Sequence, residues 1–181
     1  MEFKKTHIPG PLVIQPKVFG DARGYFFESF SSRMFDQQGI SEDFVQDNQS
    51  LSNKGILRGL HFQAPPFAQS KLIRVIKGAV LDVIVDIRRG SPTYGEHFAL
   101  ELNEENFSML YIPKGFAHGF YTMEDATIFS YKCSEFYEPK SEGGIMWNDP
   151  DLKIDWGVDQ PLLSEKDKNY IPFKDFKTPF V

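Results

Sequence analysis

The sequence is poor in several features that would otherwise direct its interpretation. Its 181 residues include one cysteine, Cys133, so the chain forms no intrachain disulfide and no site with several thiolate ligands. No hydrophobic run approaches the length of a membrane span, and residues 1–16 lack the apolar stretch of a signal peptide. We therefore expect a cytoplasmic protein without a membrane segment.

Positive charge is also scarce. The chain carries 20 Lys and Arg against 25 Asp and Glu, which leaves a net charge of -5 at pH 7. Proteins that bind nucleic acid present a basic face that displaces counterions from phosphates. We expect no nucleic-acid partner, and an anionic ligand would have to be bound by a few local groups.

Helical periodicity is rare, whereas alternation of apolar and polar residues is common. Residues 31–39 predict one short helix, with Ser31 or Ser32 as its cap and Gly39 beyond its end. Strands are predicted over 12–19, 24–30, 56–63, 70–88, 97–103, 108–113, 115–122 and 127–136. The length suits one domain over 1–181, and short strands separated by Gly and Pro indicate an all-β, jelly-roll barrel of two sheets. The turn-rich segment 135–181 is expected to wrap over that barrel.

Two segments carry the residues suited to chemistry. The first holds His61, Gln63 and Lys71, and the second is "PKGFAH", which ends at His118. Together they resemble the paired motifs of the cupin superfamily, small β-barrels in which His-x-His, a Glu and a final His bind one metal ion. Gln63 stands at the second His position and Lys71 at the Glu position. Because an ammonium group has no free lone pair and repels a cation, we expect a cupin-type barrel with no metal and no cofactor.

The substituted pocket suits proton transfer next to a carbonyl group. His61 and His118 are imidazoles that titrate near neutral pH, and Lys71 supplies a fixed positive charge. A base that removes a proton, a cation that stabilises the enolate oxygen and an acid on the opposite face would together invert a carbon centre. Tyr131 is the candidate acid, because it shares a strand face with Phe129 and Cys133 and points into the barrel if they do.

A closer resemblance covers nearly the whole chain. The motifs "FGDARGYFFESF", "VQDNQS", "LRGLHFQ", "KLIRVIKG", "VDIRRGSPTYG", "IPKGFAHGFYT" and "SEGGIMWNDPDLKIDW" are similar to those of the dTDP-4-dehydrorhamnose 3,5-epimerase family. The resemblance implies that His61 is the base, oriented by Asp167, and that Tyr131 is the acid. It implies that Lys71 supports the enolate at the C4 oxygen. It also implies a nucleotide-sugar site lined by Arg23, Phe26, Glu28, Gln46, Asp47, Asn48, Arg58, Gln63, His118, Glu142 and Lys166. Family members are homodimers in which part of "DARGYFFE" reaches the neighbour's site.

The sequence leaves more than one role or orientation open for three residues. Strict alternation places Arg58 opposite to His61, so either Gly59 introduces a bulge or Arg58 reaches around a sheet edge. Asp82 neutralises Lys71, orients His61 as a second carboxylate, or faces outward. Asp167 orients His61 or belongs to an exposed helix cap, since its position near the end of the chain is not determined by spacing.

The resulting expectation is an isomerase that converts dTDP-4-keto-6-deoxy-D-glucose to dTDP-4-keto-L-rhamnose without a cofactor. A 3-epimerase or ketoisomerase acting on the same nucleotide sugar is the nearest alternative. A sugar-nucleotide-binding barrel without catalysis is disfavoured by the set His61, Lys71 and Tyr131, because binding needs no proton donor and acceptor that face each other. A metal-dependent oxygenase is disfavoured by Gln63 and Lys71.

Overall fold

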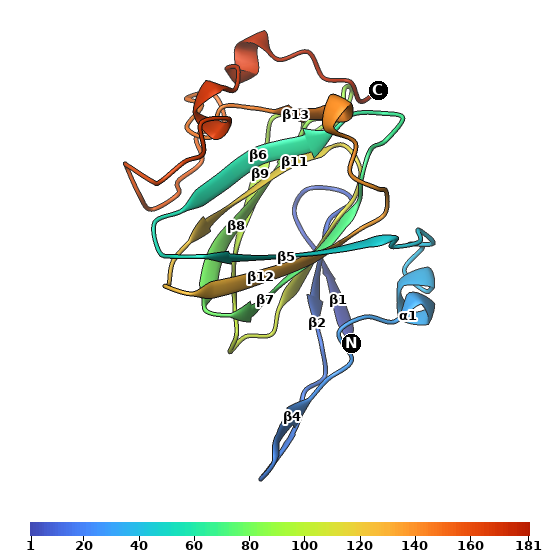
Figure 1. Cartoon of the computed structure of the whole chain (residues 1–181). Coiled ribbons are helices and arrows are strands. Elements are labelled where there is room, and N and C mark those ends of the chain that lie inside the picture. The colour runs from blue at the N-terminus through green and yellow to red at the C-terminus, as the bar shows by residue number, and fades with distance from the viewer.

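The computed structural model describes all residues, 1–181, and contains two large antiparallel sheets that face each other (Figure 1). The six-stranded sheet runs in the order β1 (Glu2–Lys5), β2 (Leu12–Gln15), β10 (Met109–Ile112), β7 (Lys71–Lys77), β12 (Thr127–Cys133) and β5 (Gln46–Ser52). The five-stranded sheet runs in the order β13 (Glu142–Gly144), β6 (Leu57–Gln63), β11 (Phe116–Thr122), β8 (Ala79–Asp86) and β9 (His97–Asn103). The predicted all-β jelly-roll fold is confirmed.

Helices are few and short. The helix α1 (Ser32–Asp36) begins after Ser31 as predicted, and Gly39 beyond it has a positive φ of 77°. Three 3-10 helices lie in the carboxyl-terminal third, namely η1 (Pro139–Ser141), η2 (Asp167–Asn169) and η3 (Phe173–Asp175). No helix is both long enough and apolar enough to cross a membrane.

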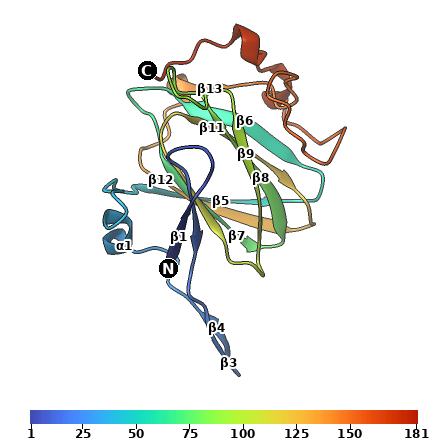
Figure 2. The same cartoon turned by 180° about the vertical axis from the view of Figure 1, so that it is seen from behind.

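A third sheet is a separate hairpin of two short strands, β3 (Phe19–Asp21) and β4 (Gly24–Phe26). It projects from the barrel, as both views show, on the side opposite to the carboxyl-terminal segment (Figure 2). Every residue of the two strands is exposed, including Phe19, Tyr25 and Phe26, whose side chains keep more than half of their surface accessible. The hairpin therefore leaves three aromatic side chains uncovered in the single chain.

Apolar residues divide between the two faces of the five-stranded sheet. In β8, Val80 and Ile84 point into the core between the sheets, whereas Val83 and Val85 point to the outer face. This is the predicted two-residue alternation. The outer face is covered by the carboxyl-terminal segment, whose Leu152, Trp156 and Phe180 are buried against it. The segment thereby comes close to β6 and the residues that β6 carries.

The structure differs from the predicted strands in several respects. The strands β1 and β13 were not predicted, and the strands predicted from residues 12, 24 and 127 end earlier than predicted, at Gln15, Phe26 and Cys133. The predicted strand over 70–88 is two strands, because the chain reverses at Gly78 with a φ of 77°, and any side chain there would overlap Thr127. The strand β5, which carries "QDNQS", was not predicted as a strand. All its residues except Leu51 are polar, so apolar alternation is absent although each residue is paired with β12.

Candidate active site

A cavity of about 600 Å³ lies between the two sheets, and a neighbouring one of about 310 Å³ shares one wall with it. The shared wall consists of Asn48, His61, Lys71 and Tyr131. His61 comes from the five-stranded sheet, while the other three come from the six-stranded sheet. The structure therefore brings the predicted base, cation and acid together, with the base on one side and the other two on the opposite side.

A bulge in β6 turns His61 and Arg58 to the same side of the sheet. His118 pairs with His61 and Phe120 pairs with Arg58, so β6 has one more residue than β11 between these pairs. The extra residue fits because Gly59 and Gly119 lack side chains: a Cβ on Gly59 would lie 2.5 Å from the Gly119 Cα. Of the two alternatives for Arg58, the structure supports the bulge at Gly59, and Arg58 lines the larger cavity.

His61 is held by a carboxylate from the carboxyl-terminal segment. Its Nε2 lies 2.5 Å from the Asp167 Oδ1, and the Asp167 Oδ2 accepts a hydrogen bond of 2.8 Å from the Ser164 hydroxyl. Burial raises the pKa of Asp167, but the hydrogen bonds from His61 and Ser164 outweigh burial and leave this pKa below its usual value. An ionised Asp167 only accepts, so the imidazole donates from Nε2 and its Nδ1 keeps the lone pair. Asp167 lies 3% exposed beside His61 and not in an exposed cap.

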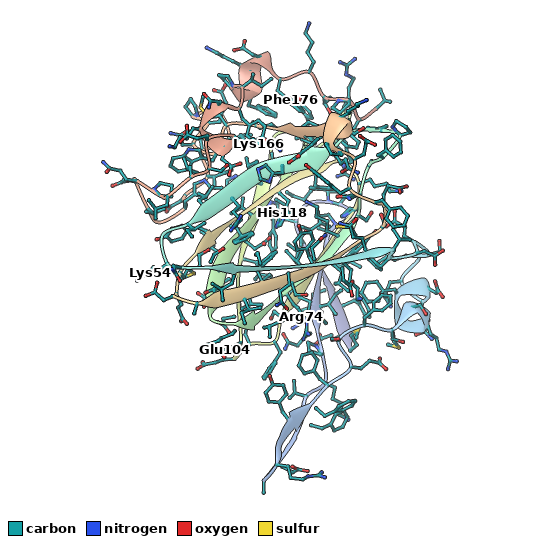
Figure 3. The ribbon with its side chains drawn as sticks, in the orientation of Figure 1. Lys54, Arg74, Glu104, His118, Lys166 and Phe176 are labelled. Atoms are coloured by element: carbon teal, nitrogen blue, oxygen red, sulfur yellow. The ribbon has the colours of Figure 1, made fainter.

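Asp82 forms a second carboxylate–imidazole pair, deeper in the barrel. Its Oδ2 lies 2.8 Å from the Nε2 of His118, and both side chains are buried. Burial lowers the pKa of His118, which keeps this imidazole neutral. The outward-facing alternative for Asp82 is wrong, and so is the alternative that it orients His61. His118 lines the cavity floor between the sheets (Figure 3).

Lys71 and Tyr131 face His61 from the opposite sheet. The Lys71 Nζ lies 5.8 Å from the centroid of the Tyr131 ring. Burial lowers the pKa of Lys71, which makes its ammonium group a stronger acid than an exposed lysine. Burial raises the pKa of Tyr131, so its phenol stays protonated. Both groups are therefore suited to give a proton or a hydrogen bond to an anion formed in the cavity.

Several predicted binding residues join the same cavities. Gln46, Asn48, Arg58, His118, Glu142 and Lys166 line one or both of them. The Arg58 guanidinium donates hydrogen bonds to the Ser52 hydroxyl, with nitrogen–oxygen distances of 3.3 and 3.4 Å, and forms no ion pair within the chain. Lys166, which belongs to the carboxyl-terminal segment, pairs with Glu142 at 2.5 Å (Figure 3). Arg58 and Lys166 are thus two cations at the rim of the larger cavity.

Gln63 has a structural role in the chain. Its amide nitrogen donates to the carbonyl oxygens of Phe67 and Phe136, and its amide oxygen accepts from the backbone nitrogen of Glu138. Both donated hydrogen bonds go to the backbone, and the side chain is buried. Gln63 therefore ties two loops together at the wall of the smaller cavity, and its role in substrate binding stays a prediction.

Four predicted binding residues do not reach the cavities of their own chain. Arg23 lies on the projecting hairpin, 89% exposed, and pairs with Asp21. Phe26 and Glu28 are exposed on or next to the same hairpin. Asp47 points to the outer face of the six-stranded sheet, where it pairs with Lys132 at 2.9 Å. Asp47 is outside the site because its neighbours Gln46 and Asn48 take the inward positions.

Three residues of the site were not predicted. Ser164 orients Asp167, the Tyr137 hydroxyl donates to Glu142 at 2.5 Å, and the Tyr170 ring packs edge-on against His61 with centroids 5.6 Å apart. Ser164 had a local signal, since Ser164 and Asp167 stand three residues apart, as in a turn in which a hydroxyl bonds a following backbone group. Tyr137 and Tyr170 had none, because only the tertiary structure brings their segments to β6.

The chain is similar to proteins of known name. Residues 5–175 match the family model described as dTDP-4-dehydrorhamnose 3,5-epimerase. The chain is 50% identical over 176 residues to the dTDP-4-dehydrorhamnose 3,5-epimerase of Shigella flexneri, with 97% of each chain covered. It is 48% identical over 176 residues to that of Methanothermobacter thermautotrophicus, covering 96% of this chain and 95% of the relative. The crystal structure of dTDP-6-deoxy-D-glucose-3,5-epimerase from Legionella pneumophila in complex with dTDP-4-keto-L-rhamnose superposes with a TM-score of 0.95, at 44% identity over 99% of this chain and 98% of that chain.

Proposed function

The chain belongs to the dTDP-4-dehydrorhamnose 3,5-epimerase family, and we propose that His61, Lys71 and Tyr131 carry out its reaction. The enzyme is an isomerase of dTDP-L-rhamnose biosynthesis. It inverts C3 and C5 of dTDP-4-keto-6-deoxy-D-glucose to give dTDP-4-keto-L-rhamnose. The observation that supports these roles is that His61 on the five-stranded sheet, held by Asp167 of the carboxyl-terminal segment, lies across one cavity from Lys71 and Tyr131 on the six-stranded sheet.

The reaction begins with removal of a proton from carbon. The Nδ1 of His61 takes the proton at C5 or C3, both of which are acidified by the C4 ketone. The Asp167 carboxylate, 2.5 Å from Nε2, stabilises the imidazolium that forms. The electron pair of the broken C–H bond moves to the C4 oxygen and gives an enolate.

Lys71 stabilises that enolate. Its ammonium group is the cation on the cavity wall opposite His61, and its lowered pKa favours hydrogen bonding to an oxyanion. Reprotonation then occurs from the other face: the Tyr131 phenol donates its proton to C5, and water serves at C3. Arg58 and Lys166 at the rim bind the diphosphate, since each is a cation within an otherwise acidic protein.

The reaction as proposed needs no metal ion. Lys71 occupies the place of the carboxylate ligand of the cupin motif, and Gln63 uses its amide to hold two loops. Elemental analysis of the purified enzyme tests this point: an active preparation with much less than one equivalent of metal supports it, and stoichiometric iron, zinc or manganese would contradict it.

We propose that the enzyme is a homodimer in which the β3–β4 hairpin completes the partner's site. The hairpin carries Arg23 and Phe26 away from its own cavity and leaves three aromatic side chains exposed. A second copy would cover that surface and would place a cation near a diphosphate. A cytoplasmic location is also proposed, because a chain with a single, buried thiol suits a reducing compartment.

Incubation with dTDP-4-keto-6-deoxy-D-glucose in D2O tests the function. Deuterium at both C3 and C5, with an L-lyxo product, is the expected result, measured by NMR and mass spectrometry. Exchange at C3 alone would indicate a 3-epimerase or a ketoisomerase, which differ in product. Bound substrate with no exchange at either carbon would mean that the barrel binds without catalysis.

The substitution Tyr131→Phe tests the acid. Loss of the phenol should lower turnover by about 100-fold while substrate affinity stays close to that of the wild type, because general acid catalysis typically contributes this much. Tyr121→Phe is the matched control: Tyr121 lies on the outer face of β11, packed under the carboxyl-terminal segment. Unchanged turnover in Tyr131→Phe would remove Tyr131 from its role.

A further inference from the structure

Gly144 leaves an empty position beside His61 on the neighbouring strand. In the pairing of β13 with β6, Gly144 stands directly opposite His61. Side chains that stand opposite each other in an antiparallel pair lie on the same face of the sheet, with their Cβ atoms about 5 Å apart. Because residue 144 is glycine, no side chain from β13 packs against the imidazole.

The ring of Tyr170 fills this position. A Cβ on Gly144 would overlap three carbons of that ring. The ring meets the His61 imidazole edge-on, with centroids 5.6 Å apart and an angle of 64° between their planes. Tyr170 thus replaces, from the carboxyl-terminal segment, the cross-strand neighbour that β13 lacks.

The backbone fixes Tyr170 at this place. Ile171 forms a parallel bridge with Ile145, and the Met146 backbone nitrogen donates to the Ile171 carbonyl at 3.0 Å. Ile145 faces the outer core, so the alternate residues Gly144 and Tyr170 face the site. Asp167, which bonds the His61 Nε2, lies three residues earlier in the same segment. One segment therefore supplies both the hydrogen-bond acceptor and the ring that flank His61.

The phenol oxygen of Tyr170 takes no part in hydrogen bonding. It is buried and has no partner in the chain. Burial raises its pKa, so the phenol stays neutral beside Glu142 and Asp167. Any contribution of Tyr170 to the site therefore comes from its ring, which packs against the His61 imidazole.

We propose that Tyr170 is a positioning residue for His61: its ring, seated over Gly144, fixes the imidazole against Asp167 and shields their hydrogen bond from water. This inference rests on the proposed function, because it assigns Tyr170 to the support of the catalytic base. An imidazole free to rotate would spend less time with Nδ1 directed at the substrate, and small misplacements of a catalytic group cost up to about 100-fold in rate.

The test compares Tyr170→Phe, Tyr170→Ala, Gly144→Ala and the double variant Gly144→Ala/Tyr170→Ala. Tyr170→Phe should match the wild type, because the hydroxyl has no partner. Tyr170→Ala should lower kcat by about 10- to 100-fold with KM changed by less than about threefold. Gly144→Ala should lower kcat similarly, since the new methyl group displaces the ring, yet it should have little further effect once Tyr170 is alanine.

A second readout does not depend on catalysis. In the free wild-type enzyme the His61 Nε2 proton, held by Asp167, should give a far-downfield proton resonance that exchanges slowly with water, and Tyr170→Ala should broaden it. If Tyr170→Ala fails to fold, Tyr170→Leu and Gly144→Ala test the same contact. Wild-type kcat and a protected resonance in Tyr170→Ala would overturn the inference, as would full additivity of the two substitutions. Failure of the wild type to exchange C3 and C5 would instead refute the proposed function, while the resonance would still report on Tyr170.

Discussion

At the scale of single residues, two carboxylate–imidazole pairs in one barrel differ in what they can do. His61 is partly exposed to the cavities and is held by an ionised Asp167, so it can gain and lose a proton against substrate. His118 is buried, and burial lowers its pKa. The Asp82–His118 pair therefore suits a fixed hydrogen-bonding partner at the cavity floor. The two histidines therefore have different roles because they differ in burial.

Asp167→Asn tests the support of the base. Asparagine keeps the shape but loses the negative charge that stabilises the imidazolium, so kcat should fall by about 100-fold or more, with a small change in KM. Deuterium exchange at C5 is the direct measurement. Glu165→Gln is the matched control, because the Glu165 carboxylate is exposed and pairs only with Lys168. Equal exchange rates in Asp167→Asn and Glu165→Gln would remove Asp167 from the mechanism.

At the scale of secondary-structure elements, the bulge in β6 determines which side chains of this strand face the cavity. In a regular strand, Arg58 and His61 would point to opposite faces because they are three residues apart. The bulge needs close contact of two strands, since the Cβ of an alanine at 119 would lie 2.8 Å from the Arg58 carbonyl oxygen and 3.1 Å from the Gly59 Cα. The pair of glycines therefore permits the geometry on which the rim cation and the base depend.

Gly119→Ala should separate β6 from β11. We expect a loss of about 1–3 kcal/mol in the free energy of unfolding, as for other overpacked positions, together with a fall in kcat and a rise in KM. Urea unfolding and steady-state kinetics measure the two effects. Gly20→Ala is the control for a glycine in a strand with room for a methyl group. A Gly119→Ala enzyme with wild-type stability would show that the close contact of β6 and β11 is not needed for stability.

The connection from β8 to β9 depends on one buried carboxylate. Asp86 accepts hydrogen bonds from the Arg88 guanidinium and backbone nitrogen and from the hydroxyls of Ser91 and Thr93. Burial raises the pKa of Asp86, but these hydrogen bonds outweigh it and leave the pKa lowered. A lowered folded-state pKa means that the stabilisation is present above the unfolded value of about 4 and is lost as pH falls through the folded value.

Asp86→Asn should therefore destabilise the enzyme by about 3 kcal/mol at pH 7. The difference between wild type and variant should shrink as the pH falls below about 4, because the Asp86 carboxyl is protonated first in the unfolded chain and only at lower pH in the folded one. Urea unfolding at several pH values measures this difference in the free energy of unfolding. Asp151→Asn is the control, because Asp151 is exposed. A difference that stayed constant down to acid pH would show that the charge of Asp86 is not what stabilises the turn.

At the scale of the whole molecule, the single chain holds a reaction chamber but not every predicted binding group. The β3–β4 hairpin projects from the barrel in both views of the fold (Figure 1, Figure 2), and its residues Arg23 and Phe26 line neither cavity. The proposed homodimer explains this separation, because each hairpin would then serve the site of the other subunit. Its interface would also cover aromatic side chains that the monomer exposes.

Mixing two inactive variants tests whether each active site contains residues from both subunits. Arg23→Ala should bind substrate weakly, and His61→Asn should not exchange deuterium. In a heterodimer of the two, one site combines the intact His61 of one chain with the intact Arg23 of the other. Refolding an equal mixture should restore about a quarter of wild-type activity, since half the dimers are mixed and each has one intact site. No recovery would show that Arg23 serves its own chain or no site.

The sequence by itself determined the barrel, most of its strands and the chemical groups of the site. Alternation in residues such as Val80 to Ile87 depends only on which side chains avoid water, so it is visible without coordinates. His61, Lys71 and Tyr131 were predicted because short motifs place them at fixed positions on inward-facing strands. The polar strand β5 was missed, since pairing with β12 and not apolar alternation makes it a strand.

Only the tertiary structure decided which groups meet. The partner of Asp82 is His118 rather than His61, the amide of Gln63 binds backbone, and Tyr170 packs on His61 over the space left by Gly144. Each of these contacts joins segments that lie far apart along the chain, or depends on a bulge that breaks the two-residue period. Local patterns determine the direction of a side chain relative to its own strand, but its partners depend on how the sheets and the carboxyl-terminal segment close around the cavity.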